Sequence, residues 1–191
     1  MWWPTNMPRR VPLEAVCRQF LAVLLTVMAG GCGFQLRGAP PVSPALQPLA
    51  VSCANQVPIS LCEAVLDQLT LGGVNLQDER TAKFVLRLSN FEQDRRATAI
   101  TGQAAAAEYT LRYSVGMELI SQDKMPMIAS TRLTTSESYR YDEANVLAKQ
   151  REEDTLRTQL NNRLAQQVIF RLAPLTEARI QAIRDQQSKV Q

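Results

Sequence analysis

Cysteine is the residue type whose position in this chain points most directly to a chemical reaction. Cys32 follows the small residues 29–31, which end an apolar run that begins at Phe20. Arginines precede the run, so the segment has the basic start, apolar centre and small-residue cleavage site of a bacterial export signal. A cysteine at the cleavage point predicts that residues 1–31 are removed and that Cys32 becomes an acylated N-terminal residue.

The chemistry expected at Cys32 is covalent lipid attachment, with an S-diacylglycerol on its sulfur and an N-acyl group on its new amino group. A plain cleaved signal peptide and an uncleaved membrane anchor are the alternatives. The ten-residue run Phe20–Ala29 would span about 15 Å as a helix, whereas the hydrocarbon core of a bilayer is roughly 30 Å thick. The length of the run therefore disfavours an anchor and favours cleavage.

Two further cysteines, Cys53 and Cys62, remain in the mature chain once Cys17 leaves with the signal. In an exported protein they either form a disulfide or stay as separate thiols, and the oxidising compartment favours the disulfide. Closing so short a loop would add roughly 2–3 kcal/mol of stability in the chain-entropy model.

The chain contains no histidine, and this absence removes several classes of active site. It excludes a Ser-His-Asp triad, a Cys-His pair and histidine ligands for a metal. Two cysteines alone would half-fill a zinc site, and no phosphate-binding loop or dinucleotide fingerprint is present. The acidic run 152–154 fits a solvated face near a helix N-terminus. The sequence therefore predicts no catalytic residues, no metal and no cofactor other than the lipid on Cys32.

The net charge argues against nucleic acid as a partner. The whole chain has 21 basic and 18 acidic residues, a formal net charge of +3. Residues 1–31 carry three arginines and one glutamate, so the mature chain keeps 18 basic and 17 acidic residues and a net charge of +1. A nearly neutral chain without a nucleic-acid motif is not expected to bind DNA or RNA.

Alternating and apolar patterns predict a sheet. From Tyr109 to Leu119 apolar residues occupy every second position, which is typical of an antiparallel strand with one buried and one wet face. Residues 121–124 are predicted to form the turn to the next strand. The predicted strands cover residues 49–53, 84–91 with an extension to 100, 109–119 and 127–141.

Apolar residues repeat at helical spacing in two segments. The first helix is predicted to start at a capping box formed by Ser60 and Glu63 and to stop at Gly72-Gly73. The second is predicted to be capped by Asp142 and to end at Pro174. Its apolar stripe should lie on the inner face of the sheet, and the stripe consists of Leu156, Leu160, Leu164, Val168, Ile169 and Leu172.

The order β-α-β-β-β-α predicts an α+β fold in which two helices pack on one face of a four-stranded mixed sheet. We expect this domain to cover residues 49–174. Residues 32–48 are rich in proline and are predicted to form an extended tether behind the acylated cysteine. Residues 175–191 are predicted to be a C-terminal tail with a frayed end.

Four groups of short segments have an order and spacing that extend over nearly the whole mature chain. They are residues 31–37 (Gly-Cys-Gly-Phe-Gln-Leu-Arg), 61–76 (from Leu61-Cys-Glu to Gly73-Val-Asn-Leu), Gly102-Gln103 with Ala107-Glu-Tyr109, and Leu147-Ala-Lys149. Together these segments resemble the LPS-assembly lipoprotein LptE family, the plug subunits of the outer-membrane lipopolysaccharide translocon. The family fold, two helices on a four-stranded sheet, agrees with the pattern above.

The resemblance implies a function without catalysis. LptE-like proteins sit inside the β-barrel of LptD, support its assembly and bind lipopolysaccharide on its way to the cell surface. The implied partners are therefore an LptD-like barrel, lipopolysaccharide and, through the lipid on Cys32, the outer-membrane bilayer on its periplasmic side. Gly33, in place of the Asp that retains lipoproteins in the inner membrane of enteric bacteria, favours the outer membrane. The alternative is an accessory lipoprotein of another lipid-transport or envelope-assembly complex.

Lys149 matches a family lysine in its Leu-Ala-Lys context and is the first candidate for contact with lipopolysaccharide. Members of the family can carry a basic residue just before the Gly-Gln pair, but in this chain Ile100 and Thr101 precede Gly102-Gln103. Arg95 and Arg96 are therefore the candidates to take the place of that basic residue in binding lipopolysaccharide. A base beside a lipid A phosphate gains charge-assisted hydrogen bonds. The alternative for such bases on the predicted wet faces is a solvated ion pair with a nearby acid.

Overall fold

The computed structural model describes residues 42–100, 102, 106–141 and 145–189 of the chain. Cys32, the predicted export signal and Asp142 lie outside the described residues. Within the described ranges no helix combines the length and the apolar character that crossing a bilayer needs.

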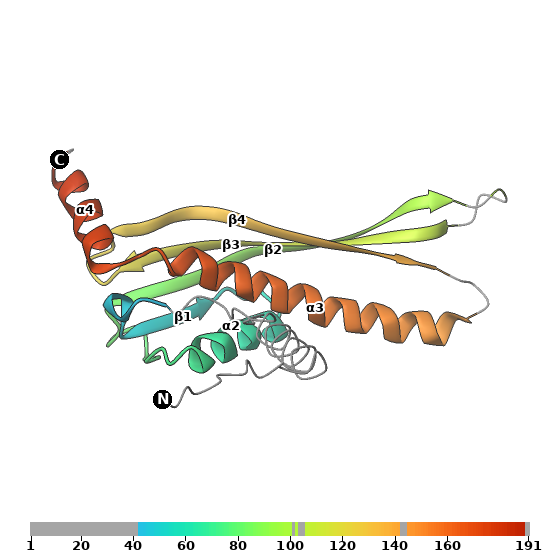
Figure 1. Ribbon diagram of the computed structural model, residues 1–191, viewed down its shortest axis with the longest axis horizontal. Helices are drawn as coiled ribbons and strands as arrows, with labels where there is room; N and C mark the ends of the chain where they lie inside the picture. The colour runs from blue at the N-terminus through green and yellow to red at the C-terminus, as the bar shows by residue number, and fades with distance from the viewer. Residues whose placement is uncertain (1–41, 101, 103–105, 142–144, 190–191) are drawn as a thin grey trace, which may run out of the picture. The chain divides into compact units, whose positions relative to one another are not determined.

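The sheet consists of β1 (Leu49–Cys53), β2 (Phe84–Ile100), β3 (Ala106–Ser121) and β4 (Pro126–Arg140). These strands lie side by side in the order β1-β2-β3-β4 (Figure 1), with β1 parallel to β2 and the other neighbours antiparallel. In β3, Leu111 and Tyr113 are buried whereas Arg112 between them is exposed, as the two-residue period of a strand requires. The predicted four-stranded mixed sheet is confirmed.

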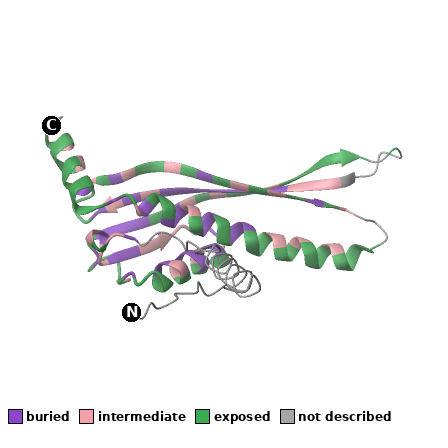
Figure 2. Cartoon of the chain, viewed as in Figure 1, coloured by how far each residue is buried: buried purple, intermediate pink, exposed green. Residues whose placement is uncertain are grey.

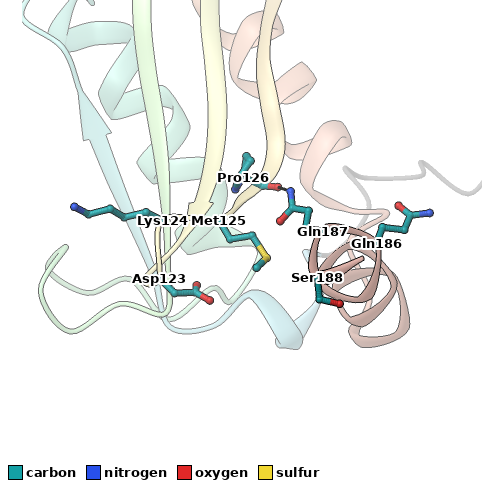
Figure 3. Close-up of a pocket in the computed structure, with 7 residues that line it drawn as sticks. All are labelled: Asp123, Lys124, Met125, Pro126, Gln186, Gln187 and Ser188. Atoms are coloured by element: carbon teal, nitrogen blue, oxygen red, sulfur yellow. Dashed lines mark hydrogen bonds between the residues drawn. The ribbon is translucent and has the colours of Figure 1, made fainter. Parts of the chain in front are cut away.

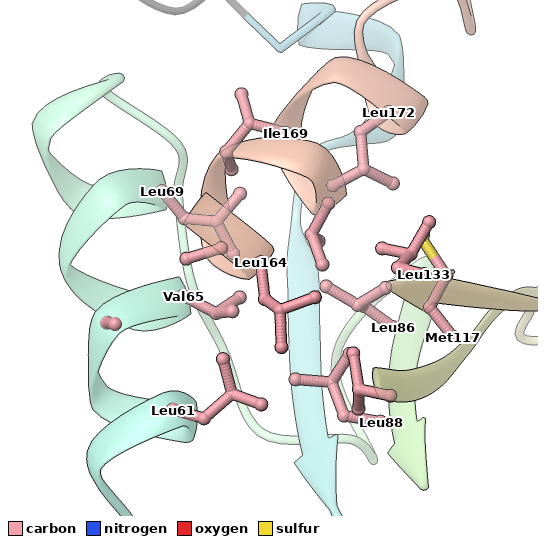
Figure 4. Packing of buried hydrophobic residues seen from close by; sticks show 14 of the residues in the cluster. Leu61, Val65, Leu69, Leu86, Leu88, Met117, Leu133, Leu164, Ile169 and Leu172 are labelled. Atoms are coloured by element: carbon pink, nitrogen blue, oxygen red, sulfur yellow. The ribbon is translucent and has the colours of Figure 1, made fainter. Parts of the chain in front are cut away.

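Two helices, α2 (Ile59–Leu71) and α3 (Val146–Leu172), pack on one face of the sheet (Figures 1 and 4). Val65 of α2, Leu164 of α3 and Leu86 of β2 belong to one buried cluster, and each is fully buried. The stripe predicted from helical spacing therefore faces the sheet as expected. The order β-α-β-β-β-α and the two-helix layer are confirmed.

The N-terminal boundary of the packed unit lies earlier than predicted. A short 3₁₀ helix, η1 (Pro44–Leu46), precedes β1. Val42 and Leu46 are both buried in the main core. The prediction of an extended tether is therefore wrong for residues 42–48, because two apolar side chains anchor this stretch to the core.

The C-terminal boundary lies later than predicted. Residues expected to be a tail form a further helix, α4 (Glu177–Ser188), whose N-terminus is capped by the Thr176 hydroxyl. Leu175 and Ile180 are buried in the same core as the strands. The prediction of a C-terminal tail is therefore wrong over α4, since Ile180 and Ile183, three positions apart, pack against the core.

The start of α2 differs from the predicted capping box. The helix begins at Ile59, one residue before Ser60, and Pro58 ahead of it makes no side-chain cap. The hydroxyl of Ser60 instead accepts a hydrogen bond from Nδ2 of Asn161 on α3 at 3.0 Å. The capping box is therefore wrong, and Ser60 links the two helices.

The ends of α3 give a mixed result. The helix stops at Leu172, two residues before Pro174, as predicted. It begins at Val146, and the residue before it, Asn145, makes no side-chain cap bond. The predicted cap, Asp142, lies outside the described residues.

A β-bulge in β2 sets which of its side chains face the helices. The pairing with β3 shifts between Ser89 and Glu92, and Asn90 adopts a positive φ of 49°. Asparagine tolerates this left-handed conformation better than most residues. Gly116 lies opposite the bulge, where an added Cβ would come within 3.2 Å of the Ser89 carbonyl oxygen. One extra residue in β2 reverses the alternation that follows, so Arg95 points towards α3.

A disulfide joins Cys53 to Cys62, the pairing that the exported chain was predicted to favour. Cys53 is the last residue of β1, and Cys62 lies in the first turn of α2. The bond therefore fixes the start of the helix to the edge of the sheet.

The edge strand β4 receives side-chain hydrogen bonds from both C-terminal helices. Nε2 of Gln167 on α3 donates to the carbonyl oxygen of Thr134 at 3.1 Å. Nε2 of Gln187 on α4 donates to the carbonyl oxygen of Pro126 at 3.4 Å. Both helices therefore contact the backbone of β4 as well as the core.

Candidate functional site

The face of α3 that meets the sheet changes character along the helix (Figure 2). Leu160 and Leu164 are fully buried in the core. Towards the start of the helix the same face continues through Leu156, Glu153 and Lys149, which are half-buried. These residues are three or four positions apart, as one helical face requires, and we call them the inner stripe of α3. Beyond Leu156 the inner stripe is charged, so the contact with the sheet becomes polar.

Aromatic and charged side chains fill this polar contact. The guanidinium carbon of Arg95 on β2 lies 3.7 Å from the ring centroid of Tyr109 on β3, within cation–π range. The same carbon lies 6.0 Å from the ring centroid of Tyr139 on β4 and 5.9 Å from that of Tyr141. The Tyr109 ring stacks on Tyr139 and meets Tyr141 edge-on. Together with Glu153 on α3, these residues form what we call the tyrosine–arginine cluster.

Glu153 connects α3 to the strands through its carboxylate oxygen Oε2. Nε of Arg95 donates to the Tyr139 hydroxyl at 3.0 Å, and this hydroxyl donates to Oε2 of Glu153 at 2.5 Å. Nε of Arg95 also lies 3.4 Å from Oε2 of Glu153. Oε1 accepts a hydrogen bond from Nη2 of Arg157 at 2.6 Å. The carboxylate is thus shared by two guanidinium groups and one phenol.

These contacts fix the charges of the cluster. Burial raises the pKa of Glu153, but the hydrogen bonds from Tyr139 and Arg157 and the nearby guanidinium charges outweigh it, so the pKa lies below its usual value. Burial and the hydrogen bond to Glu153 raise the pKa of Tyr139 to about 12. Burial lowers the pKa of Arg95, but the bond to Tyr139 and the charge of Glu153 more than compensate. At neutral pH the cluster therefore has a carboxylate, a guanidinium and a neutral phenol.

A small cavity of about 100 Å³ adjoins the cluster. Its lining includes Arg95, Arg157, Gln93 and Tyr113. Burial raises the pKa of Tyr113, so its hydroxyl stays protonated at neutral pH. The lining also includes Asp94, so basic and acidic residues both border the cavity.

Lys149 lies at the start of the inner stripe, one turn before Glu153. Its Nζ is 2.7 Å from Oε2 of Glu152, and its side chain is 22% exposed. The first turn is the end of a helix where the dipole disfavours a positive charge. Helix stability therefore does not explain a lysine at this position.

Arg96 lies on the opposite face of the sheet from Lys149. Its Nε is 2.5 Å from Oδ2 of Asp94, and its side chain is 77% exposed. A shallow hollow of about 250 Å³ there is lined in part by Arg96 and Arg112. The structure thus brings Arg95 and Lys149 to the helix-covered side and leaves Arg96 outside. The expectation that Arg95 lies on a wet face is wrong, because the bulge in β2 turns it inward.

The other members of the site were not predicted from the sequence. Tyr139 and Glu153 meet Arg95 from segments more than forty residues away. A usable signal was the spacing of Lys149, Glu153 and Leu156, which continues the predicted apolar stripe at helical intervals. The acidic run was instead assigned to a solvated helix face, and this assignment is wrong for the half-buried Glu153.

The opposite end of the long strands carries a wider cavity of about 570 Å³ (Figure 3). It lies between the β3–β4 turn and the end of α4 and is lined by residues such as Asp123, Lys124 and Gln187. In the described part of the chain, no group of three or more acidic or cysteine side chains is placed to hold a metal ion.

Comparison with known proteins gives a consistent result. The chain matches the family model "LptE: Lipopolysaccharide-assembly" over residues 46–172. The LPS-assembly lipoprotein LptE of Yersinia enterocolitica is 29% identical over 164 residues, covering 84% of this chain and 75% of the relative. The protein of the same name from Pectobacterium atrosepticum is also 29% identical, covering 80% of each chain.

A solved structure shares the fold. The crystal structure of a minor lipoprotein from Acinetobacter baumannii superposes with a TM-score of 0.55 and 25% identity, covering 66% of this chain and 90% of that one. The matched residues 46–172 hold the whole sheet, both core helices, the tyrosine–arginine cluster and Lys149. The chain therefore belongs to the LptE family of lipopolysaccharide-assembly proteins.

Proposed function

We propose that the protein is an outer-membrane lipoprotein that binds an LptD-like β-barrel, supports assembly of that barrel and takes part in inserting lipopolysaccharide at the cell surface. It acts without catalysis and is held at the periplasmic side of the membrane by the lipids on Cys32. The observation that carries the proposal is the family match over residues 46–172. The export signal ahead of Cys32 supports the location.

The geometry of Lys149 supports a role in binding lipopolysaccharide. A lysine in the first turn of α3 opposes the helix dipole, and its partner Glu152 is an exposed residue whose ion pair contributes little to stability. A lipid A phosphate offers Lys149 a stronger, charge-assisted hydrogen bond. Lys149 is therefore the residue that we propose contacts the phosphate.

Purification from solubilised outer membranes tests the proposed complex. A tagged protein with its natural signal should recover a large β-barrel protein after mild detergent extraction. Recovery of the tagged protein without a barrel would contradict the proposal. Recovery of components of a different lipid-transport assembly would instead support the accessory-subunit alternative.

Replacing Lys149 by glutamine is expected to weaken binding of purified lipopolysaccharide about tenfold, the effect of losing one charge-assisted hydrogen bond. The measurement is a titration of the soluble domain with lipopolysaccharide. Lys83→Gln is a matched control, because Lys83 is an exposed lysine at the other end of the long strands. Equal affinities for Lys149→Gln and the unchanged protein would remove Lys149 from the binding site.

A further inference from the structure

We propose that Arg95 is a positioning residue for Lys149. By binding Glu153, Arg95 keeps this carboxylate from neutralising Lys149 and leaves the lysine available to an anionic phosphate group. The inference rests on the proposed function, in which Lys149 contacts a phosphate. It assigns to Arg95 an indirect role in place of direct contact with the ligand.

The sequence places two acids within reach of Lys149. Glu152 follows Lys149 by three positions and Glu153 by four, and both spacings bring side chains together on a helix. Among the residues that the structure describes, the acid paired with Lys149 is Glu152, at 2.7 Å. Oε2 of Glu153 is directed to the strands, where Arg95 and Tyr139 bind it, and Oε1 is bound by Arg157 of α3 itself.

The two acids differ in how strongly they would hold a lysine. The side chain of Glu152 is 44% exposed, whereas that of Glu153 is only 15% exposed. An ion pair with an exposed acid is screened by solvent and is readily exchanged for a phosphate. A pair with the less exposed Glu153 would be screened less and would compete better with the ligand. By holding Glu153, the tyrosine–arginine cluster leaves Lys149 paired with Glu152, the acid that competes less strongly with a phosphate for the lysine.

Arg95 is the strand residue whose charge can hold the Glu153 carboxylate away from Lys149. Its Nε contacts both the Tyr139 hydroxyl and Oε2 of Glu153, and the Tyr109 ring holds the guanidinium from one side. Arg157 also binds Glu153, but it lies on α3 itself, so Arg95 is the cation that links the carboxylate to the strands. Without Arg95, Glu153 loses its cationic partner on the strands and can turn to Lys149.

The decisive experiment compares Arg95→Gln with the double variant Arg95→Gln/Glu153→Gln. Titrated with purified lipopolysaccharide at low ionic strength, Arg95→Gln should bind about two- to fivefold more weakly, the range of a partly exposed ion pair. The double variant should recover the affinity of the unchanged protein, because the competing carboxylate is gone. Direct contact between Arg95 and lipopolysaccharide would leave the double variant as weak as Arg95→Gln, and this result would overturn the proposal.

Further variants separate this proposal from the proposed function. In the background Lys149→Gln, adding Arg95→Gln should cause no further loss of affinity, since Arg95 acts through Lys149. If Lys149→Gln itself binds normally, the proposed function of Lys149 fails, whatever Arg95 does. Tyr139→Phe removes one hydrogen bond to Glu153 without changing any charge. Like Arg95→Gln, Tyr139→Phe should weaken binding of lipopolysaccharide. It serves as the second measurement if Arg95→Gln does not fold. Unchanged binding by a folded Tyr139→Phe variant would contradict the proposal.

Discussion

The variant Cys32→Ala is expected to incorporate no labelled palmitate, whereas the unchanged protein is labelled. Alanine has no sulfur to form the thioether with diacylglycerol, and the cleavage that exposes the amino group for acylation requires the modified cysteine. Each buried methylene of an acyl chain contributes about 0.8 kcal/mol to membrane binding, so several chains together make the attachment stable. Loss of these predicted chains is therefore expected to release the protein from the membrane.

The control for this experiment is Cys17→Ala. Cys17 lies within the predicted signal and should be absent from the mature protein, so its replacement should leave palmitate labelling unchanged. Mass spectrometry of the purified protein should place the lipid on residue 32. Continued labelling of Cys32→Ala would show that another residue is acylated and that the cleavage site is wrong.

Removing the disulfide between Cys53 and Cys62 is expected to lower the free energy of unfolding by about 2–3 kcal/mol. The two cysteines are 9 positions apart, and opening this loop returns conformational entropy to the unfolded chain. For a domain of this size the loss corresponds to a fall in Tm of roughly 4–12 °C. Urea denaturation of the double variant Cys53→Ala/Cys62→Ala measures it.

Reduction provides the control for the disulfide. The unchanged protein in excess dithiothreitol should unfold at nearly the same urea concentration as the double variant. Mass spectrometry should show a difference of two hydrogens between the oxidised and reduced protein. Equal stability of the oxidised and reduced forms would show that the bond between β1 and α2 does not limit unfolding.

The sequence was sufficient to predict the core of the fold because the core depends on repeating patterns. The alternation along β3 and the four-residue spacing from Leu156 to Leu164 each identify a buried face without reference to the rest of the chain. Packing these faces together leaves few arrangements other than two helices on a mixed sheet. The ends of the unit were missed because each contributes only a few apolar side chains to the core, such as Val42 with Leu46 and Ile180 with Ile183, and so short a pattern also occurs in tethers and tails.

The candidate site was harder to predict because it depends on a local irregularity. Arg95 and Arg96 are neighbours of the same type, and the choice of face between them is set by the extra residue in the bulge near Asn90. Asn90 and Gly116 are compatible with a bulge, but neither requires one. The spacing of Glu153 from Leu156 was enough to predict that the inner stripe has a charged end. The contact between Glu153 and Tyr139 could not be predicted in the same way, because it depends on the position of β4 beside β3.

The hydrogen bonds that Gln167 and Gln187 donate to β4 bear on aggregation. An edge strand with free carbonyl groups is a template on which another chain can add a strand. Here the carbonyls of Thr134 and Pro126 already accept side-chain hydrogen bonds, and Pro126 has no N–H to offer. A second molecule therefore finds fewer backbone partners along this edge. The two C-terminal helices thereby reduce the number of free backbone groups that this edge offers to another strand.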